Sequence, residues 1–381
     1  MYQCYSPVLR SSTDIREIPS SRPLITITGS STPTFAPNAT ASGISSVLPR
    51  PTNRRACNGH VEFCDRKFSN ITMVVAHNSP FDVPHNLASN QELGVIAQLE
   101  DSIRGLQFQT HWSQTTSQLR LCHTSCNLLD AGTLQSFLQT VHSWLVAHPY
   151  EVIAIIMGND DRVSPTTYIE PFNNSGLLPH LYVAPNTTMT VKQWPTLSEM
   201  IIHDKRVVVM LDYLANQTQV PWLLDEFNYL WETPFSPTDA AFPCTQQRPP
   251  DQTEAVSLSR MYMANHNLNV DVPFREGKGL LMPALALLHQ VNAVSGDGSL
   301  GHAVHGCTTE WGRPPNWLLV DHYNRGNFPG SVFQVAATAN NVSYNRTSCC
   351  RSMPESTAYI NESRGSGVLS ATTLVLILVV A

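Results

Sequence analysis

Short runs of apolar residues, many of them β-branched, recur along the middle of the chain and alternate with segments of helical periodicity. The clearest runs are ITMVVAH from Ile71, GLQFQTHW from Gly105, LRLCH from Leu119, VIAIIM from Val152, VVVMLDY from Val207 and WLLVDHY from Trp317. Runs that stay apolar over most of their length predict strands covered on both faces, which is typical of a parallel sheet. The alternation therefore predicts an α/β fold.

Apolar residues at three- and four-residue intervals predict two helices between these strands. The apolar face of the first helix holds Leu93, Ile96, Ala97 and Ile103. The apolar face of the second holds Leu134, Phe137, Leu138, Val141 and Leu145. Residues 218–260, rich in proline and aromatic residues, predict one helix followed by a long irregular loop. An open doubly wound sheet and a closed barrel both fit the pattern, but no G-x-G-x-x-G loop follows the first strand to favour the open sheet.

Composition divides the chain into three parts. Residues 1–56 are rich in Ser, Thr and Pro without apolar periodicity, so we expect a disordered segment there, and residues 57–350 hold one domain. Residues 351–381 form a linker and an apolar tail whose last fourteen residues carry no charge. Small residues before such a tail predict a GPI-attachment signal, with a tail-anchored helix or a plain apolar tail as alternatives. No signal-peptide core is visible at the start, and we expect a misassigned gene start.

The chain carries little charge for its length. Charged residues make up 14% of it, and the formal net charge is -6. The longest basic run is the pair Arg54 and Arg55. Binding to a phosphate backbone needs a concentrated basic surface, so a nucleic-acid partner is disfavoured. We also expect the protein to be a monomer.

Cysteines and glycosylation sequons indicate the compartment. The nine cysteines lack the paired C-x-x-C spacing of a zinc module. Cys57 with Cys64 and Cys122 with Cys126 are spaced to close short loops as disulfides, with free thiols as the alternative and the other pairings left open. Dense N-x-S/T sequons make glycosylation candidates of Asn38, Asn70, Asn173, Asn186, Asn216, Asn341, Asn345 and Asn361. Together these features predict an extracellular or cell-surface glycoprotein.

Polar side chains follow the apolar runs where the predicted strands end. They are His77 and Asn78; Gln107, Gln109 and His111; His123; Asn159, Asp160 and Asp161; Asp212 and Tyr213; and Asp321, His322 and Tyr323. A single histidine at a strand end is most simply a polar cap. In parallel α/β folds, however, the carboxyl ends of the strands meet at one mouth, where working residues sit. We do not expect so many independent caps at one mouth.

Two imidazoles and a carboxylate suit the cleavage of a phosphodiester by an internal hydroxyl. One imidazole removes the proton from the attacking hydroxyl, the other protonates the leaving alkoxide, and the carboxylate holds the base in its tautomer. Metal binding is the competing use of the cluster. Hard cations prefer carboxylate oxygens, whereas the second strand offers the amides of Gln107 and Gln109, which are weak ligands.

The sequences AHNSPF, GLQFQTHW, LCHTSC and LLVDHYNRG resemble those of the PLC-like phosphodiesterases, in particular the secreted fungal branch related to the X-region of phosphatidylinositol-specific phospholipase C. The resemblance covers roughly residues 57–330. It implies a distorted (β/α)8 TIM-like barrel, with the parallel sheet closed into a barrel, and cleavage of a glycerophosphodiester or phosphoinositide. It further implies that His77 is the general base, that His123 is the general acid and that Asp321 orients the base.

The chain departs from the family pattern at amide positions. Asn78 stands where metal-dependent members keep a calcium-ligating asparagine, and Gln107 and Gln109 stand where calcium-dependent members keep acidic ligands. These departures disfavour calcium, so we expect no metal cofactor, and they also remove the obvious cation that would neutralise the phosphate. The alternative function is a catalytically weak barrel that acts as a surface glycoprotein or binds inositol phosphates or lipid headgroups.

The remaining polar residues have weaker assignments. The candidates for binding a phospholipid or phosphodiester headgroup are Asn78, Gln107, Gln109, His111, Asp212, Tyr213 and Tyr323. His111 and His322 are as readily structural, and Asp160 and Asp161 are expected in a turn rather than as a metal pair. A glycerophosphodiester phosphodiesterase would need metal-ligating acids near the first strand, where Glu92 is the nearest candidate. A C-terminal anchor would place the protein at a membrane surface.

Overall fold

The structure is a computed structural model of the chain. It describes residues 55–345 and residue 350, apart from residues 85, 124, 274–278, 328–329 and 346–349. The predicted disordered segment (1–56) and the predicted anchor region (351–381) therefore lie outside the described residues, except for Arg55 and Ala56. Within the described part of the chain, no helix combines the length and the apolar character needed to cross a bilayer.

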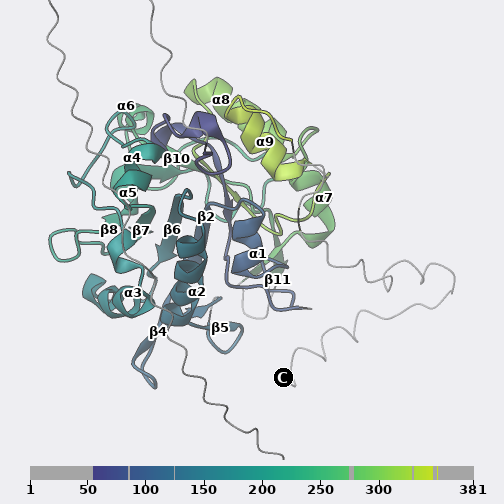
Figure 1. The fold of residues 1–381 in the computed structure, drawn as a ribbon. Coiled ribbons are helices and arrows are strands. Elements are labelled where there is room, and N and C mark those ends of the chain that lie inside the picture. Colours follow the sequence, from purple (N-terminus) through teal and green to yellow (C-terminus); the bar gives the residue numbers. More distant parts are fainter. Residues whose placement is uncertain are drawn as a thin grey trace, which may run out of the picture. The chain divides into compact units, whose positions relative to one another are not determined.

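Eight parallel strands form the central sheet (Figure 1). In chain order they are β1 (Met73–Ala76), β2 (Gly105–Gln109), β6 (Ile153–Gly158), β7 (Val207–Leu211), β8 (Leu223–Asp225), β9 (Leu230–Glu232), β10 (Met261–Asn265) and β13 (Trp317–Val320). Their order in the sheet is β8-β7-β6-β2-β1-β13-β10-β9, and all neighbours pair in parallel. The predicted α/β class and parallel sheet are confirmed.

The sheet curls, because its two edge strands are close together in the chain. β8 and β9 are linked only by the four residues of α5 (Glu226–Tyr229), which reach over roughly 17 Å at most. A flat sheet of eight strands would separate its edges by roughly 34 Å. No hydrogen-bonded ladder joins β8 to β9 in the described residues, so the prediction of a closed barrel is wrong. Each edge strand has only three residues, which leaves little ladder to pair.

Side chains at alternate strand positions enter two separate cores. On β1, Val74 packs with residues of the surrounding helices, whereas Val75 packs inside the curled sheet. Leu224 of β8 and Leu230 of β9 belong to the same inner core, as expected if the sheet edges approach each other. Burial of both faces explains why the strands are continuous apolar runs in the sequence.

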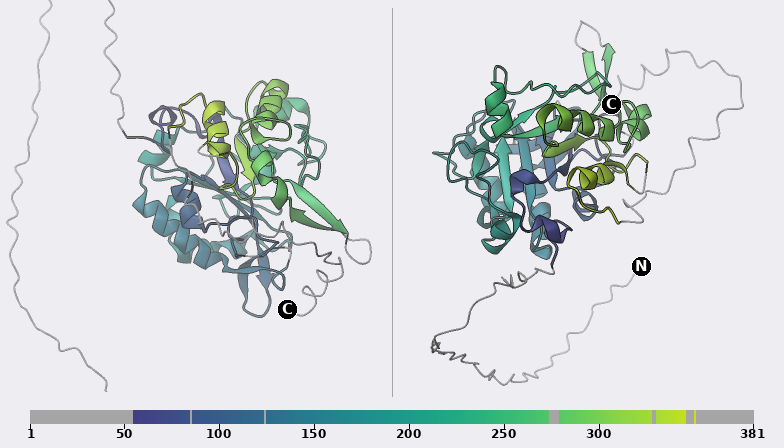
Figure 2. Two further views of the ribbon diagram at one scale, coloured as in Figure 1. Left: turned by 90° about the vertical axis from the view of Figure 1, so that its right-hand side faces the viewer. Right: turned by 90° about the horizontal axis from the view of Figure 1, so that it is seen from above.

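Helices cover the outer face of the sheet (Figure 2). The helices besides α5 are α1 (Val95–Glu100), α2 (Leu134–Ala147), α3 (Ile169–Ser175), α4 (Leu197–Ile202), α6 (Glu254–Ser259), α7 (Leu288–Val291), α8 (Leu300–Trp311) and α9 (Ser331–Ala339), and the 3-10 helices are η1 (Val61–Phe63), η2 (Phe68–Asn70), η3 (Pro165–Tyr168), η4 (Leu178–His180) and η5 (Leu285–Leu287). All five predicted core residues of α2 are buried. In α1, Leu99 is buried and the predicted core residue Ile96 is exposed. The helix has fewer than two turns, so only a few of its side chains can face the sheet.

Two antiparallel excursions leave the parallel sheet at the carboxyl ends of its strands. The first follows β2 and consists of β3 (His111–Ser113), β4 (Gln118–Cys122) and β5 (Asp130–Thr133). The second follows β10 and is a ribbon of β11 (Asn269–Pro273) and β12 (Gly279–Pro283). The sequence LRLCH lies in β4, so its expected place in the parallel sheet is wrong. Half-buried strands of this kind pair in hairpins, and local connections decide their partners.

The region predicted as one helix and a long loop contains two strands of the sheet. β8 and β9 lie there, and a long irregular segment separates β9 from α6. The irregular segment agrees with the prediction, whereas the two strands were not predicted. Three-residue strands are too short to produce a periodicity that stands out from their surroundings.

Three disulfides lie in the described domain. Cys57–Cys64 and Cys122–Cys126 are present as predicted, and Cys244–Cys307 is a further pair that sequence spacing left open. The described sequon residues are all exposed, namely Asn70, Asn173, Asn186, Asn216, Asn341 and Asn345. Asn38 and Asn361 lie outside the described residues, and glycosylation stays a prediction.

Candidate active site

His77 and Asp321 face each other at the carboxyl ends of two neighbouring strands. Ala76 of β1 pairs with Val320 of β13, so His77 and Asp321 are the next residues along each strand. Nδ1 of His77 lies 2.7 Å from Oδ1 of Asp321, and the two side chains are 14% and 3% exposed. Because a carboxylate accepts hydrogen bonds, Nδ1 carries the proton and Nε2 of His77 is the basic nitrogen.

Three buried amides extend this pair into a network. Asn90 Nδ2 donates to Oδ1 of Asp321 at 2.9 Å, and Asn78 Nδ2 donates to Oδ1 of Asn90 at 3.0 Å. Gln91 Nε2 donates to the backbone carbonyl of His77 at 2.7 Å. The amides are buried, so packing and hydrogen bonds together hold the imidazole and the carboxylate in place. Sequence reasoning missed Asn90 and Gln91, because they precede a helix and do not follow a strand.

Asn78 has an unusual backbone and an unused acceptor. Its φ is 49°, in the left-handed region that asparagine tolerates better than most residues. Its backbone N–H donates to Oε1 of Gln107 at 3.0 Å, so that oxygen of Gln107 holds the chain and is committed there. Oδ1 of Asn78 is buried and, among the described residues, has no hydrogen-bond partner. An unused acceptor therefore lies next to His77 in the chain.

His123 reaches the site from the antiparallel excursion and not from the parallel sheet. It directly follows β4, and its backbone N–H donates to the carbonyl of Leu129 at 3.0 Å. Its ring centre lies 5.3 Å from that of Phe81, in the loop after β1. Burial, and then the charge of His77, lower the pKa of His123 to about 4, while Asp321 acts in the opposite direction. The three predicted catalytic groups are thus within electrostatic reach of one another.

A disulfide fixes the segment that carries His123. Cys122 is fully buried and bonds to Cys126 across four residues, so the backbone on both sides of the imidazole is tethered. In the part of the chain that the structure describes, Nδ1 of His123 is buried without a hydrogen-bond partner. A rigid loop therefore presents an imidazole that no neighbouring side chain holds.

Arg248 brings a positive charge to the other side of the mouth. It lies in the irregular segment after β9, and its Nη1 is 3.2 Å from Oε2 of Glu232 at the end of β9. Its Nη2 donates to the Tyr213 hydroxyl at 3.1 Å and lies 3.5 Å from Oδ2 of Asp212, beyond β7. Burial raises the pKa of Asp212 to about 6, against the backbone N–H of Asn159 and the charge of Arg248. Arg248 thus links the ends of β7 and β9, which lie on opposite sides of the gap between β8 and β9.

Several buried acceptors share a cavity with Arg248. Burial, and then Glu232, raise the pKa of Glu226 well above its usual value. Oε1 of Glu226, Oε1 of Gln109 and Oδ1 of Asn265 are buried and lack partners among the described residues. All three residues line the cavity together with Arg248. The cavity measures about 10 Å³, room for about one water molecule, from which these oxygens can accept hydrogen bonds.

Gly158 makes room for Gln109 at this cavity. The two residues pair across β6 and β2, and a Cβ on Gly158 would lie 1.8 Å from Oε1 of Gln109. A side chain at that position would therefore displace the amide. Gln107, Gln109 and Asp212 are the predicted substrate-binding residues that line the cavity, and Tyr213 joins them through Arg248.

Two predicted substrate-binding residues have structural partners instead. Tyr323 is fully buried, and its hydroxyl donates to Oδ2 of Asp101 at the end of α1 at 2.7 Å. Nδ1 of His111 lies 3.1 Å from Oδ1 of Asp161, in the turn after β6, and so ties the excursion to the sheet. Both side chains are thus engaged within the protein, and their roles in substrate binding stay predictions.

His322 and Glu92 also belong to the supporting structure. Nε2 of His322 lies 3.1 Å from the carbonyl of Ser89. Oε1 of Glu92 accepts from Nε of Arg325 at 2.7 Å, and Oε2 accepts from Nδ2 of Asn324 at 2.7 Å. All three contacts join the loop before α1 to the loop after β13. Glu92 is therefore committed to these donors.

The acidic groups at the mouth do not fit a calcium ion. Asp212 and Glu232 both contact Arg248, whose guanidinium already supplies a cation. Among the described residues, the one set of three His, Cys, Asp or Glu groups at ligand spacing is Cys122, Cys126 and Asp130. Its cysteines are joined as a disulfide and offer no thiolate.

Arg248, Glu232, Glu226 and Asn265 were not predicted as site residues. Glu232 and Asn265 end strands, so the strand-end rule would have found them had β9 and β10 been recognised. Glu226 begins a one-turn helix, and Arg248 lies in an irregular segment. Neither position has a sequence signal that separates it from other polar residues.

A larger cavity of about 310 Å³ lies at the opposite end of the sheet. Residues at the amino ends of β1 and β2 line it, among them Met73 and Arg104. Arg104 pairs with Glu151 at 2.7 Å. We assign the chemistry to the carboxyl end, where titratable groups converge and where active sites of parallel α/β folds lie.

A family model and known relatives match this chain. The family model for the PI-PLC X domain (PI-PLC X 1) matches residues 63–338. A protein of Arthroderma benhamiae named "Uncharacterized secreted protein" is 53% identical over 326 residues, which cover 86% of this chain and 73% of that protein. A "PI-PLC X domain-containing protein 1" from the same organism is 41% identical over 276 residues, covering 71% of this chain and 86% of that protein.

Two solved structures of low identity are also similar. The phosphatidylinositol-specific phospholipase C of Listeria monocytogenes is 14% identical, with a TM-score of 0.46, over 74% of this chain and 96% of that chain. A mutant of the Staphylococcus aureus enzyme is 15% identical, with a TM-score of 0.48, over 73% of this chain and 94% of that chain.

Proposed function

The chain belongs to the PI-PLC X domain family, and from that membership and the geometry of the mouth we propose that it is a metal-independent phosphoric diester hydrolase acting on a phospholipid or glycerophosphodiester. The contact that carries the proposal is the 2.7 Å approach of Nδ1 of His77 to Oδ1 of Asp321. It supports a base whose second nitrogen is free, beside a second imidazole at His123.

In the proposed reaction, a hydroxyl of the headgroup attacks the neighbouring phosphorus. Nε2 of His77 takes the hydroxyl proton, and Asp321 stabilises the imidazolium that results. His123 gives a proton to the alkoxide that leaves the phosphorus. The P–O bond to the leaving group breaks as the new P–O bond forms, and the two imidazoles end with exchanged protonation states.

The low pKa of His123 makes this role dependent on the substrate. With a pKa of about 4, the imidazole is neutral in the free protein at pH 7. An anionic phosphodiester next to the ring favours the charged form and raises this pKa. Binding of the substrate therefore promotes protonation of His123, and the phosphodiester supplies the negative charge that the two imidazoles face.

The acceptors around the small cavity beside Arg248, which has room for about one water molecule, support a headgroup that places a hydroxyl there. The unused oxygens at Gln109, Glu226 and Asn265 accept hydrogen bonds. The guanidinium of Arg248 donates them, although Glu232 and Asp212 offset its charge. Inositol and glycerol both carry such hydroxyls, so activity on their phosphodiesters must be compared to tell which headgroup the protein prefers.

Two further observations support an extracellular location. One relative is named a secreted protein, and three disulfides lie in the described domain, which is typical of proteins from oxidising compartments. The predicted GPI signal and the membrane anchor that it implies lie outside the described residues.

Hydrolysis assays test the proposed function directly. Purified protein is incubated with phosphatidylinositol and with glycerophosphoinositol and glycerophosphocholine, each with and without a chelator. We expect turnover of at least one substrate, no effect of the chelator, and at least a hundredfold loss in His77→Ala and in His123→Ala. His305→Ala, which removes an exposed imidazole from α8, is the matched control. Equal activity in His77→Ala and the unsubstituted protein would refute the mechanism.

A second candidate function is headgroup binding without catalysis. The low pKa of His123 favours it, because a neutral imidazole is a poor acid at neutral pH. Calorimetric titration with inositol 1-phosphate distinguishes the two: binding without turnover of any phosphodiester would support the binder.

A further inference from the structure

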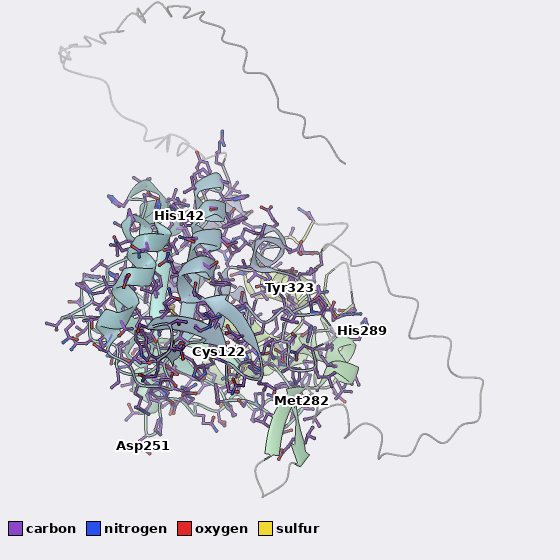
Figure 3. The ribbon with its side chains drawn as sticks, turned by 90° about the horizontal axis from the view of Figure 1, so that it is seen from below. Cys122, His142, Asp251, Met282, His289 and Tyr323 are labelled. Atoms are coloured by element: carbon purple, nitrogen blue, oxygen red, sulfur yellow. A yellow bond between two sulfur atoms is a disulfide. The ribbon has the colours of Figure 1, made fainter. Side chains whose placement is uncertain are left out.

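Two imidazoles meet among the helices that cover the sheet, away from the candidate active site. His142 lies in α2 and His180 is the last residue of η4. Their ring centres are 5.5 Å apart, and the ring planes are inclined by 33°. In Figure 3, His142 lies well apart from Cys122, the neighbour of His123 in the chain. The pair is therefore separate from the proposed hydrolytic mechanism.

The backbone next to His180 is tied to the central sheet. Leu181 forms a parallel bridge with Val207, the first residue of β7. The backbone N–H of Tyr182 donates to the carbonyl of Val207 at 2.8 Å. The position of His180 therefore follows from the fold of the sheet.

Gly176 makes room for the ring of His142. This glycine follows α3 with a φ of 86°, and a Cβ on it would lie 2.7 Å from Cε1 and 2.8 Å from Nδ1 of His142. Any other residue there would push the ring away. Among the described residues, neither nitrogen of His142 has a hydrogen-bond partner. Packing thus holds the ring and leaves its nitrogens available to another partner.

A carboxylate behind His180 sets its tautomer. Nδ1 of His180 lies 2.9 Å from Oδ2 of Asp204, in the turn that leads into β7. This contact favours the proton on Nδ1, so Nε2 of His180 is the basic nitrogen. Oδ1 of Asp204 accepts from Nε of the buried Arg206 at 2.8 Å. A carboxylate that orients an imidazole from its far nitrogen is the usual companion of a metal-binding histidine.

We propose that His142 and His180 together bind a divalent transition-metal ion of the zinc type, with Asp204 orienting His180. Two imidazoles that share one tetrahedral zinc ion, at Zn–N distances of about 2.0–2.1 Å, have ring centres roughly 5 Å apart. The observed separation is 5.5 Å. Water fills the remaining positions of the ion. Two protein ligands are fewer than the four of a structural zinc site, so we expect reversible binding to a domain that folds without the ion.

The charges around the pair select the kind of ion. The guanidinium of Arg206 offsets the carboxylate of Asp204. Nζ of Lys205 donates to the carbonyl of Pro179, which brings a second positive charge close to His180. Calcium and magnesium, which need several oxygen ligands, are disfavoured in such surroundings. Imidazole nitrogens suit zinc, copper and nickel, so we expect zinc to bind and calcium not to bind.

Calorimetric titration with zinc chloride tests the site. The full chain is freed of metal with a chelator and dialysed, and it carries His77→Ala throughout so that the two imidazoles at the mouth cannot share an ion. We expect zinc to bind and calcium chloride to give no binding heat. His142→Ala and His180→Ala should each weaken zinc binding at least tenfold, and Asp204→Asn should weaken it about ten- to hundredfold.

A second histidine pair supplies the matched control. His302 and His305 lie one helical turn apart on α8, and both are exposed. His305→Ala separates this pair and should leave zinc binding unchanged. Thermal melting without zinc checks that every variant folds, and with zinc it should show a rise in the melting temperature that His142→Ala and His180→Ala lack.

Three outcomes would overturn the inference. They are no zinc binding by the parent chain, unchanged zinc affinity in His142→Ala or in His180→Ala, and loss of binding in His305→Ala. The contact between the two rings would then only pack η4 against α2. None of these measurements depends on hydrolysis, so the test of the site is independent of the proposed function.

Discussion

His77 and Asp321 are 244 residues apart in the chain, yet Nδ1 of the imidazole lies 2.7 Å from Oδ1 of the carboxylate. The contact exists because β1 and β13 are neighbours in the parallel sheet and both end at the paired Ala76 and Val320, one residue before His77 and Asp321. Strand register therefore sets which nitrogen of His77 carries a proton. The effect of moving this proton from Nδ1 to Nε2 on catalytic activity can be measured.

Replacement of Asp321 by Asn should reduce activity without loss of the fold. An amide can donate to Nδ1, which would place the ring proton on Nε2 and remove the basic nitrogen from the mouth. We expect kcat/KM to decrease between about a hundredfold and ten-thousandfold. Asp160→Asn, in the exposed turn after β6, is the control. An unchanged kcat/KM in Asp321→Asn would contradict a base at His77.

The pH dependence of kcat/KM should report His123. The protonated fraction of this imidazole in the free protein decreases about tenfold for each pH unit above its pKa of about 4. We therefore expect kcat/KM to decrease with rising pH above this pKa. We expect kcat to decrease at a higher pH, because the phosphate of bound substrate raises the pKa of His123. His123→Ala should lack both decreases. A kcat/KM that rises steadily from pH 4 to pH 8 would exclude His123 as the acid.

His266 should make the fold sensitive to acid. Burial lowers its pKa from 6.5 to about 4, against its contact with the carbonyl of Val291. Between these values the unfolded chain binds a proton that the folded chain does not, so stability rises with pH and is lost as the pH falls from about 6.5 towards 4. The effect is about 3 kcal/mol at most.

Urea unfolding between pH 4 and pH 7 measures this effect. We expect His266→Gln, whose amide can still donate to Val291, to show a flatter dependence of the unfolding free energy on pH than the unsubstituted protein. His305→Gln, at an exposed position, should leave the slope unchanged. Equal slopes in His266→Gln and the unsubstituted protein would show that another group controls acid unfolding.

Loss of Arg248 should destabilise the mouth. Glu232 and Asp212 both contact its guanidinium, and Arg248→Met leaves these buried acids without a cation. We expect a decrease of about 3 kcal/mol in the unfolding free energy at pH 8. The loss should shrink below pH 6, because the raised pKa of Asp212, about 6, lets this group take up a proton.

Arg248→Lys separates charge from geometry in this prediction. It restores one positive charge without the fork that spans both carboxylates, so we expect it to recover part of the lost stability. Arg120→Met, which removes the half-exposed partner of Asp130, should change the unfolding free energy by less than about 1 kcal/mol. A destabilisation by Arg248→Met that is equal at pH 8 and pH 5 would rule out Asp212 as the source.

Much of the fold could be predicted because the strands are covered on both faces. The runs that became β1, β6, β7 and β13 are long enough to stand out as continuous apolar segments. The short edge strands β8 and β9 could not be recognised from the sequence. The opening of the sheet between them could therefore not be predicted either. Closure depends on contacts between those edges, which no local pattern records.

The sequence by itself determined which groups stand at the ends of the long strands, because a strand that runs out of apolar residues must present its next side chains at the edge of the sheet. His77 and Asp321 were found in this way, and His123 through the resemblance and its position after a strand. The tertiary structure alone decided that Asn90 donates a hydrogen bond to Asp321. It also decided that Arg248 contacts both Glu232 at the end of β9 and Asp212 after β7. Those contacts join residues from irregular segments, whose positions follow from packing of the whole domain and not from any local periodicity.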